Sequence, residues 1–326
     1  MSSQNIWVLY ELSGDTPKRV SLELTQKAHE LAAARGEKAA AVIIGENPEE
    51  AAKAAFANGA DCVIAVKQKT CFEAEAYIMA QLIGKYQPKL VMVPSTPQGR
   101  DTAAAISVRC GVGIAVDCTD IRIEGEQIVW ERPSYDGRLY AQIRLETDPQ
   151  IGTLRAGVFK MKEAAKDGAE GEIIYETVDV PASVILTQFL GFRPDADLEK
   201  TNIEDADIIV AGGLGFGSKE EFDKLYELAA LLGGNVGASR AAVDQGWVSK
   251  ERQIGITGKT ITPKLYIGFG ISGAVPHVNG MKNSDVIIAV NSDPNAPIFK
   301  HTHYGIVGDL HVIVPALIEK FKEIRG

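Results

Sequence analysis

The residues best suited to chemistry in this 326-residue chain follow a series of apolar runs in its second half. Gly213-x-Gly215-x-Gly217 comes after the run Ala206–Val210, and Ser218 to Glu221 then has the spacing of a capping box, which satisfies free N–H groups where a helix begins. A strand, a glycine-rich turn and a capped helix together favour phosphate binding, because glycines permit close approach and the helix start offers N–H groups and a positive dipole. The spacing differs from GxGxxG, so an ordinary tight turn is the alternative interpretation.

Further loops with glycine or small polar residues follow the later apolar runs, namely 237–240 (GASR), 254–259 (IGITGK), 270–277 (GISGAVPH) and 291–294 (NSDP). Loops at the carboxyl ends of strands converge on one crevice in open α/β sheets. We therefore expect a nucleotide-like ligand in that crevice.

Three residues of these loops offer different chemistry: Arg240 a fixed cation, Thr257 a hydroxyl and His277 a titratable donor. No Ser–His–Asp order and no pair of carboxylates accompanies them, as nucleophilic or acid–base catalysis would require. The pattern favours a site that holds a cofactor which carries the chemistry itself. A surface ion pair is the alternative interpretation of Arg240, and a structural role is the alternative for His277.

The spacing of the histidines and cysteines gives little support for a metal site or a disulfide. His301 and His303 would share a face of an extended segment, but no further ligand follows at an obvious spacing, so we expect no metal. The four cysteines have neither CxxC spacing nor a nearby histidine and are predicted to be buried or partly buried thiols: Cys62, Cys71, Cys110 and Cys118.

Composition places the chain among ordinary globular proteins, with 45% hydrophobic and 24% charged residues. The 34 basic and 43 acidic side chains give a net charge of −9, which argues against binding nucleic acid through phosphate neutralisation. No apolar run approaches the roughly 20 residues that span a bilayer, and the N-terminus lacks the pattern of a secretory signal. We expect a cytoplasmic protein of two domains.

The elements that must position these residues form two α/β domains. Apolar runs separated by segments of helical period predict a parallel sheet covered on both faces in the first half. The predicted strands there are Ile6–Leu9, Ala40–Ile44, Cys62–Val66 and Leu90–Pro94, and the predicted helices are Ser21–Arg35, about Glu49–Asn58 and Glu73–Tyr86. In the second half, the predicted strands are Ala206–Val210, Leu265–Phe269 and Val286–Val290, and the last helix is Val314–Ile324.

Between these two parts, short runs with turn signals predict hairpin structure appended to the first sheet. These runs are Asp120–Ile123, Gln127–Arg132, Leu139–Ile143 and Gln150–Leu154. The charged segment Glu163–Glu172 is expected to lie at the surface, and Phe192–Lys200 is the predicted linker. The fold class is therefore α/β, with a Rossmann-like N-terminal parallel-sheet domain (1–195) that carries the hairpin and a second Rossmann-like domain (196–326).

Several of these segments closely resemble the α subunit of electron-transfer flavoproteins. The resemblance is most specific in GASRAAVDQGWV (237–248), ITGKTITPKLYIGFGISGAVPHVNGMKNSDVIIAVNSDPNAPIF (256–299) and YGIVGDL (304–310). The first half agrees through QGRDTAAAIS (98–107), VDCTDI (116–121), RPSYDGRLYAQI (132–143) and GTLRAGVF (152–159). The resemblance implies a heterodimer with a β subunit and an FAD held mainly by the second domain. It also implies that the first domain is similar to adenine nucleotide hydrolases and contacts the β subunit.

The resemblance also implies roles for individual residues. Ser239 and Arg240 are expected to contact the flavin, with Arg240 as the cation that favours its reduced, anionic forms. Thr257 is expected near the flavin N5 edge, and His277 near the C2 carbonyl, where a donor stabilises negative charge. Backbone groups of Ser272 to Val275 are expected around the ribityl and pyrophosphate, and Asn291 and Asp309 at the ADP half. The complete predicted site comprises Gly213, Leu214, Ser239, Arg240, Ile254, Gly255, Ile256, Thr257, Ser272, Gly273, Ala274, Val275, Pro276, His277, Asn291, Asp309 and Leu310.

This chain departs from the family pattern at a few positions. The family usually reads GGRG where this chain has Leu214 in place of the arginine, which removes a cation near the cofactor. Thr302-His303 stands where Ala-Asp is frequent, and Ala156 stands where proline is common. The Leu214 change bears most directly on the flavin potential.

The function implied is that of an electron carrier rather than a self-contained catalyst. Its FAD would accept electrons from a dehydrogenase, such as an acyl-CoA dehydrogenase, or from the β subunit, and pass them to a redox acceptor. Some bacterial members bifurcate electrons, with NADH and a second FAD handled by the β subunit, and this chain is compatible with either type. A non-redox regulatory or scaffold subunit that binds nucleotide is an alternative, supported by Leu214. A self-contained nicotinamide-dependent dehydrogenase is a third reading, but it lacks an evident acid or base on the substrate side.

Overall fold

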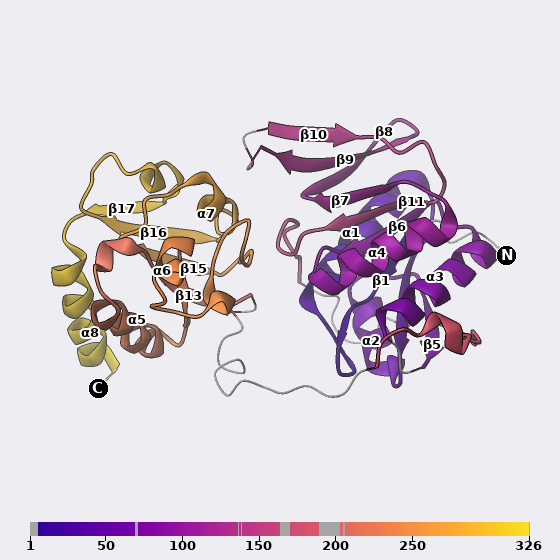
Figure 1. The fold of residues 1–326 in the computed structure, drawn as a ribbon, viewed down its shortest axis with the longest axis horizontal. Helices are drawn as coiled ribbons and strands as arrows, with labels where there is room; N and C mark the ends of the chain where they lie inside the picture. Colours follow the sequence, from indigo (N-terminus) through magenta and orange to yellow (C-terminus); the bar gives the residue numbers. More distant parts are fainter. Residues whose placement is uncertain are drawn as a thin grey trace. The chain divides into compact units, whose positions relative to one another are not determined.

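The computed structural model describes residues 6–68, 71–135, 137, 139–163, 170–188, 203–204 and 206–325. The chain divides into two compact units, the first formed mainly by described residues between 6 and 188 and the second mainly by those between 203 and 325. Each unit is described by itself (Figure 1). The predicted linker Phe192–Lys200 and the predicted boundary between residues 195 and 196 lie outside the described residues.

A seven-stranded sheet with the order β12-β5-β4-β1-β6-β11-β7 forms the centre of the first unit, and all its neighbouring strands run parallel. The four strands predicted for this half are confirmed as β1, β4, β5 and β6, because their apolar runs are buried on both faces of the sheet. The strands are β1 (Ile6–Leu9), β4 (Ala39–Gly45), β5 (Cys62–Lys67), β6 (Leu90–Pro94), β7 (Ile114–Cys118), β11 (Gln150–Leu154) and β12 (Glu172–Glu176).

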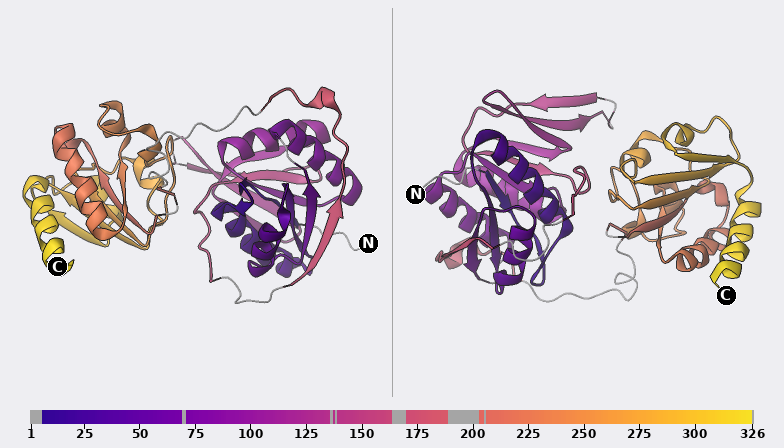
Figure 2. Two further views of the ribbon diagram at one scale, coloured as in Figure 1. Left: turned by 90° about the horizontal axis from the view of Figure 1, so that it is seen from below. Right: turned by 180° about the vertical axis from the view of Figure 1, so that it is seen from behind.

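Helices cover both faces of this sheet (Figure 2). They are α1 (Arg19–Arg35), α2 (Pro48–Ala57), α3 (Phe72–Tyr86) and α4 (Pro97–Cys110). The sequence analysis did not predict α4, whose limits are set by local chemistry. The Thr96 hydroxyl accepts a hydrogen bond from the Gly99 N–H at 2.9 Å, Pro97 occupies the first turn, and Gly111 ends the helix in the left-handed region at φ 67°.

The prediction that Gln150–Leu154 belongs to the appended hairpins is wrong. This segment is β11, which pairs in parallel with β6 on one side and β7 on the other. Residues 151–154 are all buried, as expected for a strand inside a covered parallel sheet. A Cβ at Gly152 would lie only 2.3 Å from the Trp130 ring, so the glycine allows that ring to pack on the strand.

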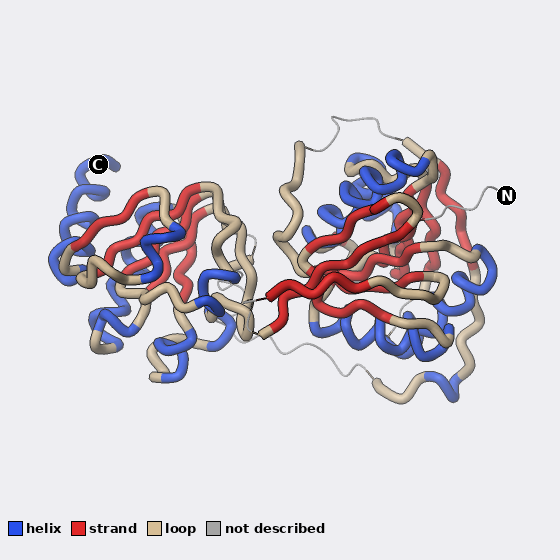
Figure 3. The backbone as a smooth tube through the Cα atoms, turned by 90° about the horizontal axis from the view of Figure 1, so that it is seen from above, coloured by secondary structure: helices blue, strands red, loops and turns tan. Residues whose placement is uncertain are grey.

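The other three predicted hairpin strands are confirmed as an antiparallel sheet of β8 (Asp120–Glu124), β9 (Gln127–Ser134) and β10 (Leu139–Ile143). This sheet lies beside β7 at one side of the first unit (Figures 1 and 3). The remaining short elements of the unit are β2 (Leu12–Ser13), β3 (Thr16–Pro17) and the 3-10 turn η1 (Ala182–Val184). The segment predicted to lie at the surface, Glu163–Glu172, ends where strand β12 begins. Residues 164–169 of this segment lie outside the described parts.

The second unit contains a five-stranded parallel sheet with the order β14-β13-β15-β16-β17. Its strands are β13 (Ile208–Gly212), β14 (Asn235–Ala238), β15 (Leu265–Phe269), β16 (Val286–Asn291) and β17 (Tyr304–Val307), of which β17 was not predicted. Its helices are α5 (Lys219–Leu232), α6 (Arg240–Asp244), α7 (Val275–Asn279) and α8 (Leu310–Arg325), joined by the 3-10 turns η2 (Leu214–Phe216), η3 (Lys250–Arg252) and η4 (Pro297–His301). The last helix therefore begins four residues before the predicted Val314.

Helices α5 and α8 pack on one face of this sheet through Phe222, Leu225 and Val314, and α7 contributes Val278 to the core on the other face. The predicted cap of α5 is half confirmed. The Ser218 hydroxyl accepts a hydrogen bond from the Glu221 N–H at 3.3 Å, whereas the Glu221 carboxylate contacts Lys224 and His311. Across the parts of the chain that the structure describes, no helix combines the length and the apolar character needed to cross a membrane.

Candidate active site: a cavity at the strand ends

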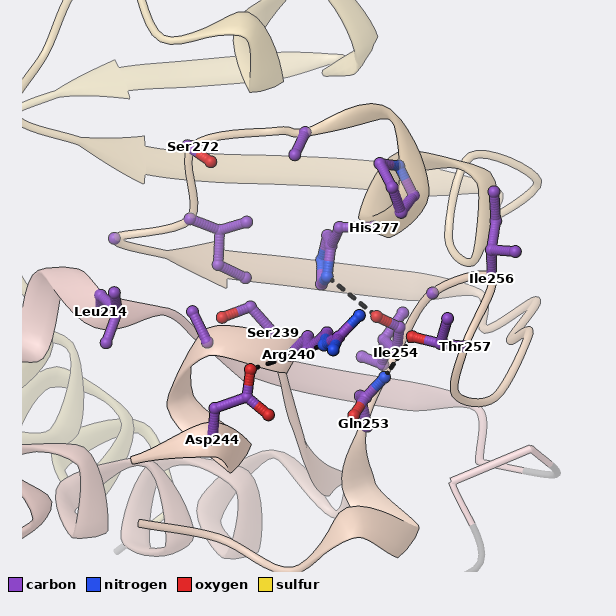
Figure 4. A pocket seen from close by; sticks show the side chains of 16 residues that line it. Leu214, Ser239, Arg240, Asp244, Gln253, Ile254, Ile256, Thr257, Ser272 and His277 are labelled. Atoms are coloured by element: carbon purple, nitrogen blue, oxygen red, sulfur yellow. Dashed lines mark hydrogen bonds and ion pairs between the residues drawn. The ribbon is translucent and has the colours of Figure 1, made fainter. Parts of the chain in front are cut away.

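A cavity of about 510 Å³ opens where β13, β14 and β15 end. Its wall includes Leu214 near one end and Thr257 near the other (Figure 4). The lining residues are Leu214, Ser239, Arg240, Ala241, Asp244, Gln253, Ile254, Gly255, Ile256, Thr257, Gly270, Ile271, Ser272, Ala274, Pro276 and His277. The loops after β13, β14 and β15 therefore converge as predicted, whereas the predicted loop 291–294 does not line the cavity.

The glycine-rich turn after β13 packs against the loop that follows β15. The Gly213 N–H donates to the Phe269 carbonyl at 2.9 Å, and a Cβ at Gly213 would lie 2.3 Å from the Gly270 carbonyl oxygen. Similarly, a Cβ at Gly215 would lie 2.7 Å from the Gly270 Cα. These glycines let one loop approach another, and Leu214 between them lines the cavity with a side chain that is 49% exposed.

Ser239 and Arg240 lie where β14 passes into the short helix α6. The Arg240 Nε is 3.5 Å from the Asp244 Oδ2, one helical turn later, and both side chains are mainly exposed (Figure 4). The Ser239 hydroxyl does not cap the helix, and the Ser239 backbone N–H donates to the Gly212 carbonyl at 3.0 Å. The cavity wall thus carries a cation, a neighbouring carboxylate and a hydroxyl that is not used as a helix cap.

The segment from Gln253 to Thr257 forms the part of the wall beside the end of β14, where the Ile254 N–H donates to the Ala238 carbonyl at 2.9 Å. The Gln253 amide, on a side chain that is only 4% exposed, donates to the Thr257 Oγ1 at 2.8 Å. Because the threonine oxygen accepts this bond, its own proton is left to donate to another group. The Ile256 N–H donates to the Pro276 carbonyl at 2.9 Å, which fastens the segment to the first turn of α7.

His277 is buried in α7, and both its ring nitrogens have partners within the unit. Its Nδ1 lies 3.1 Å from the Ile254 carbonyl oxygen, and its Nε2 lies 2.8 Å from the Tyr266 hydroxyl. Burial lowers the pKa of His277 to about 4, although the bond to Ile254 acts in the opposite direction. The ring is therefore neutral at physiological pH.

The comparisons with known proteins match this architecture. The family model for the electron transfer flavoprotein domain matches residues 6–181, and the model for the electron transfer flavoprotein FAD-binding domain matches residues 202–282. The chain belongs to the electron transfer flavoprotein alpha-subunit family. The second match covers all the residues that line the cavity, and it lies within the second unit.

Relatives align over nearly the whole chain. The electron transfer flavoprotein subunit alpha of Thermoanaerobacterium thermosaccharolyticum is 40% identical, and the alignment covers 99% of each chain. The protein of the same name from Clostridium acetobutylicum is 39% identical over 98% of this chain and 97% of its own. Protein FixB of Azorhizobium caulinodans is also 39% identical, over 98% of this chain and 89% of its own.

The residues of the cavity fit the FAD of this family. A volume of about 510 Å³ lies within the usual range for small-molecule sites. Ile254, Ile256 and Ile271 supply apolar surface for a ring system, while Arg240 and the hydroxyl of Thr257 supply polar contacts. The short helices α6 and α7 both begin at the wall, and neither N-cap side chain binds a first-turn N–H.

Eleven of the seventeen residues predicted for the site line the cavity, and six do not. Gly273, at φ 87°, packs so closely that a Cβ would lie 2.2 Å from the Ile298 nitrogen, and Val275 is the exposed first residue of α7. Asn291 donates to the Ile271 carbonyl at 3.0 Å and so holds the cavity loop indirectly. Asp309 accepts a hydrogen bond from the His311 N–H at 2.9 Å, and Gly213 packs in the turn described above. Leu310 is buried at the start of α8.

Five lining residues are absent from the predicted set of site residues: Ala241, Asp244, Gln253, Gly270 and Ile271. Gly270 and Ile271 belong to the loop 270–277, which the sequence analysis expected at the crevice. Asp244 stands four residues after Arg240, which is the spacing of neighbours on a helix. Gln253 has no such signal, because its contact with Thr257 depends on the loop conformation.

The other chemically suggestive residues lie elsewhere. His303 Nδ1 accepts a hydrogen bond from the Ile287 N–H at 3.0 Å. The cysteines are confirmed as free, with Cys62 and Cys118 buried and Cys71 and Cys110 partly buried. Within the described ranges, no group of three or more His, Cys, Asp or Glu side chains is arranged to hold a metal ion.

Proposed function

We propose that the chain is the FAD-carrying subunit of a heterodimer with an electron transfer flavoprotein β subunit. In this proposal it passes electrons between a dehydrogenase, such as an acyl-CoA dehydrogenase or a similar flavoenzyme, and a redox acceptor. The observation that carries the proposal is the cavity at the ends of β13, β14 and β15, which lies within the match to the FAD-binding domain. Two of the relatives are named as alpha subunits, which supports assembly with a second chain. The cytoplasmic location stays a prediction.

The FAD, when bound, supplies the redox chemistry, and the side chains of the cavity would bind it and adjust its charge balance. Arg240 would place a positive charge beside a group that gains negative charge on reduction, which favours the reduced form. Asp244, 3.5 Å from Arg240, would weaken that effect. Thr257, oriented by Gln253, would donate its hydroxyl proton.

The predicted donor role of His277 carries an additional requirement. The Ile254 carbonyl can only accept, so the neutral ring carries its proton on Nδ1, and Nε2 accepts from Tyr266. This arrangement leaves the neutral ring without a further N–H. Direct donation to the cofactor therefore requires a different partner arrangement from the one in this structure, and the donor role stays a prediction.

A purification and titration experiment tests the proposal. The chain is expressed together with a β subunit of the same family, and FAD per heterodimer is measured by absorbance. We expect FAD to be retained and to be reduced by an acyl-CoA dehydrogenase and its substrate. A colourless complex that takes up no added FAD would overturn the proposal.

The same complex distinguishes the two types of carrier and the scaffold alternative. Anaerobic titration with NADH that reduces two flavins per heterodimer rapidly indicates a bifurcating complex. One flavin without a response to NADH indicates a simple carrier. The non-redox alternative, favoured by the apolar Leu214 at the cavity wall, predicts bound nucleotide that no electron donor reduces.

A further inference from the structure

A buried tyrosine connects the centre of the second sheet to the cavity wall through His277. Tyr266, in β15, is 0% exposed, and its hydroxyl lies 2.8 Å from the His277 Nε2. His277 in turn donates from Nδ1 to the Ile254 carbonyl, which belongs to the segment lining the cavity. Three elements that are distant in sequence are thus joined by two hydrogen bonds.

The directions of both bonds follow from the groups involved. A carbonyl oxygen only accepts, so Nδ1 carries the proton, and the lone pair of Nε2 then accepts from the phenol. Burial raises the pKa of Tyr266 and lowers that of His277, so both groups are neutral. The Ile254 carbonyl therefore selects the Nδ1–H tautomer, and the tyrosine hydroxyl, by donating to Nε2, holds the ring in the orientation that this bond requires.

The backbone around Tyr266 makes room for this contact. A Cβ at Gly268, two residues later on the same face of β15, would lie 2.9 Å from the Tyr266 Cε1 and 3.0 Å from its hydroxyl oxygen. The tyrosine side chain thus occupies space that any other residue at 268 would fill. The Tyr266 and His277 rings are also in contact, with centroids 6.2 Å apart.

The segment that His277 holds has little other freedom. Gly255 adopts φ 140°, and a Cβ there would lie 2.8 Å from the Pro276 carbonyl oxygen. The Ile256 N–H donates to the same carbonyl. Rotation of the His277 ring would remove the bond to the Ile254 carbonyl and loosen the attachment of this segment to α7.

We propose that Tyr266 is a positioning residue: by donating to Nε2, its hydroxyl holds the His277 ring in the orientation in which Nδ1–H binds the Ile254 carbonyl, and thereby holds residues 254–257 in the cavity wall. The consequence for FAD rests on the proposed function, whereas the hydrogen-bond arrangement does not. Tyr266 is too deeply buried to touch a ligand itself, so it acts through His277.

The test compares Tyr266→Phe with Tyr304→Phe, which alters a tyrosine that is 65% exposed on β17 of the same sheet. Full-length chains labelled with ¹⁵N-histidine are studied by long-range ¹H–¹⁵N correlation, with His277→Gln used to assign the signal. We expect the wild-type His277 to show the Nδ1–H tautomer with a hydrogen-bonded Nε2. Tyr266→Phe should shift the Nε2 resonance toward that of an unbonded nitrogen, and Tyr304→Phe should leave it unchanged.

A second measurement, of FAD affinity, tests the effect on the cavity wall. Loss of one buried hydrogen bond should weaken FAD binding by roughly 5- to 10-fold in Tyr266→Phe and leave it unchanged in Tyr304→Phe. An Nε2–H tautomer in the wild type, or a His277 spectrum that Tyr266→Phe leaves unchanged, would overturn the proposal. If Tyr266→Phe does not fold, the wild-type Nε2 resonance still tests the proposal, because an Nε2 without a hydrogen bond would overturn it. A wild-type chain with the expected tautomer whose heterodimer with the β subunit binds no FAD would support the hydrogen-bond arrangement while overturning the proposed function.

Discussion

The two parallel sheets of this chain differ most in the residues that follow their strands. In the first unit, the strand order changes direction between β1 and β6, and the space there amounts to about 10 Å³, room for about one water molecule. In the second unit, the order changes direction between β13 and β15, and a cavity of about 510 Å³ opens there. Similar topology therefore gives a closed strand end in one unit and an open one in the other.

Side-chain chemistry explains the closed end. The buried Glu11 carboxylate, after β1, binds Lys18 and accepts a hydrogen bond from the Thr96 hydroxyl at 2.6 Å. Asp117 and Arg155, near the ends of β7 and β11, are joined by two hydrogen bonds of 2.7 and 2.5 Å. These charged and polar groups at the strand ends of the first unit thus pair with one another.

The open end of the second unit carries smaller or differently directed side chains. Gly270, Ser272 and Ala274 follow β15 and leave space that larger residues would fill. Arg240 is 67% exposed at its side chain, and its neighbour Asp244 is 62% exposed, so this pair does not fill the cavity. Topology thus marks where a ligand can bind, and the side chains at the strand ends decide whether there is room.

The largest expected effect comes from closing the open end. Ala274→Trp places a bulky ring in the cavity at the exposed N-cap residue of α7, whose side chain makes no capping hydrogen bond, so the core is left intact. We expect FAD affinity, measured by fluorescence titration, to fall at least 100-fold, or about 2.7 kcal/mol. Val312→Trp, at a residue of α8 that is 67% exposed, is the control and should bind FAD normally. Normal FAD content in Ala274→Trp would show that the cofactor lies elsewhere.

A smaller effect is expected from the closed end, where Glu23 of α1 binds the backbone that follows β11. Its two carboxylate oxygens accept from the Gly157 N–H at 2.8 Å and the Phe159 N–H at 2.7 Å. In Glu23→Gln, an amide NH₂, which cannot accept a hydrogen bond, would face one of these N–H groups in place of the protonated carboxyl, whose hydroxyl oxygen still can. We expect a loss of about 1–3 kcal/mol in the free energy of unfolding at pH 5, measured with urea.

The pH dependence of this loss has a definite sign. Burial raises the pKa of Glu23 to about 7, above its ordinary value of 4.5, despite the opposing hydrogen bonds from Phe159 and Gly157. The contribution of this group to stability is therefore full below pH 4.5 and is lost as the pH rises through 7. The loss in Glu23→Gln should be smaller at pH 8 than at pH 5. The control is Glu30→Gln, on the exposed side of the same helix, which should change the free energy of unfolding by less than about 0.5 kcal/mol at either pH. An equal loss at both pH values in Glu23→Gln would contradict the assigned titration.

The sequence predicted those parts of the fold that depend on local patterns. The runs at 6–9, 62–66 and 265–269 are continuous and apolar, and each is a buried parallel strand. The position of β11 could not be found in this way, because pairing with β6 and β7 is a long-range event and Gly152 resembles a turn residue. Helix α4 was missed because its apolar pattern is interrupted by polar residues, although Thr96-Pro97 marks its start.

The site likewise contains residues that local sequence order predicts and residues that depend on long-range packing. Residues that directly follow a strand, such as Ser239 and Ser272, could be placed at the cavity from sequence order alone. Gln253 and Tyr266 could not, because each acts through a hydrogen bond whose partner is set by loop or helix packing. The roles predicted for individual residues toward FAD stay predictions.

The smallest expected effect comes from adding a charge to the open end without closing it. Leu214 lines the cavity and is about half exposed, so a cation introduced there would be partly screened by solvent. In Leu214→Arg, the added positive charge should raise the one-electron potential of the bound FAD by on the order of 30–60 mV, about 1 kcal/mol, in spectroelectrochemical titration. Leu214→Met keeps a similar volume without the charge and should leave the potential unchanged. Because the effect is electrostatic, the shift in potential should also become smaller as salt is added. A shift that is absent or downward would mean that the side chain at 214 points away from the flavin.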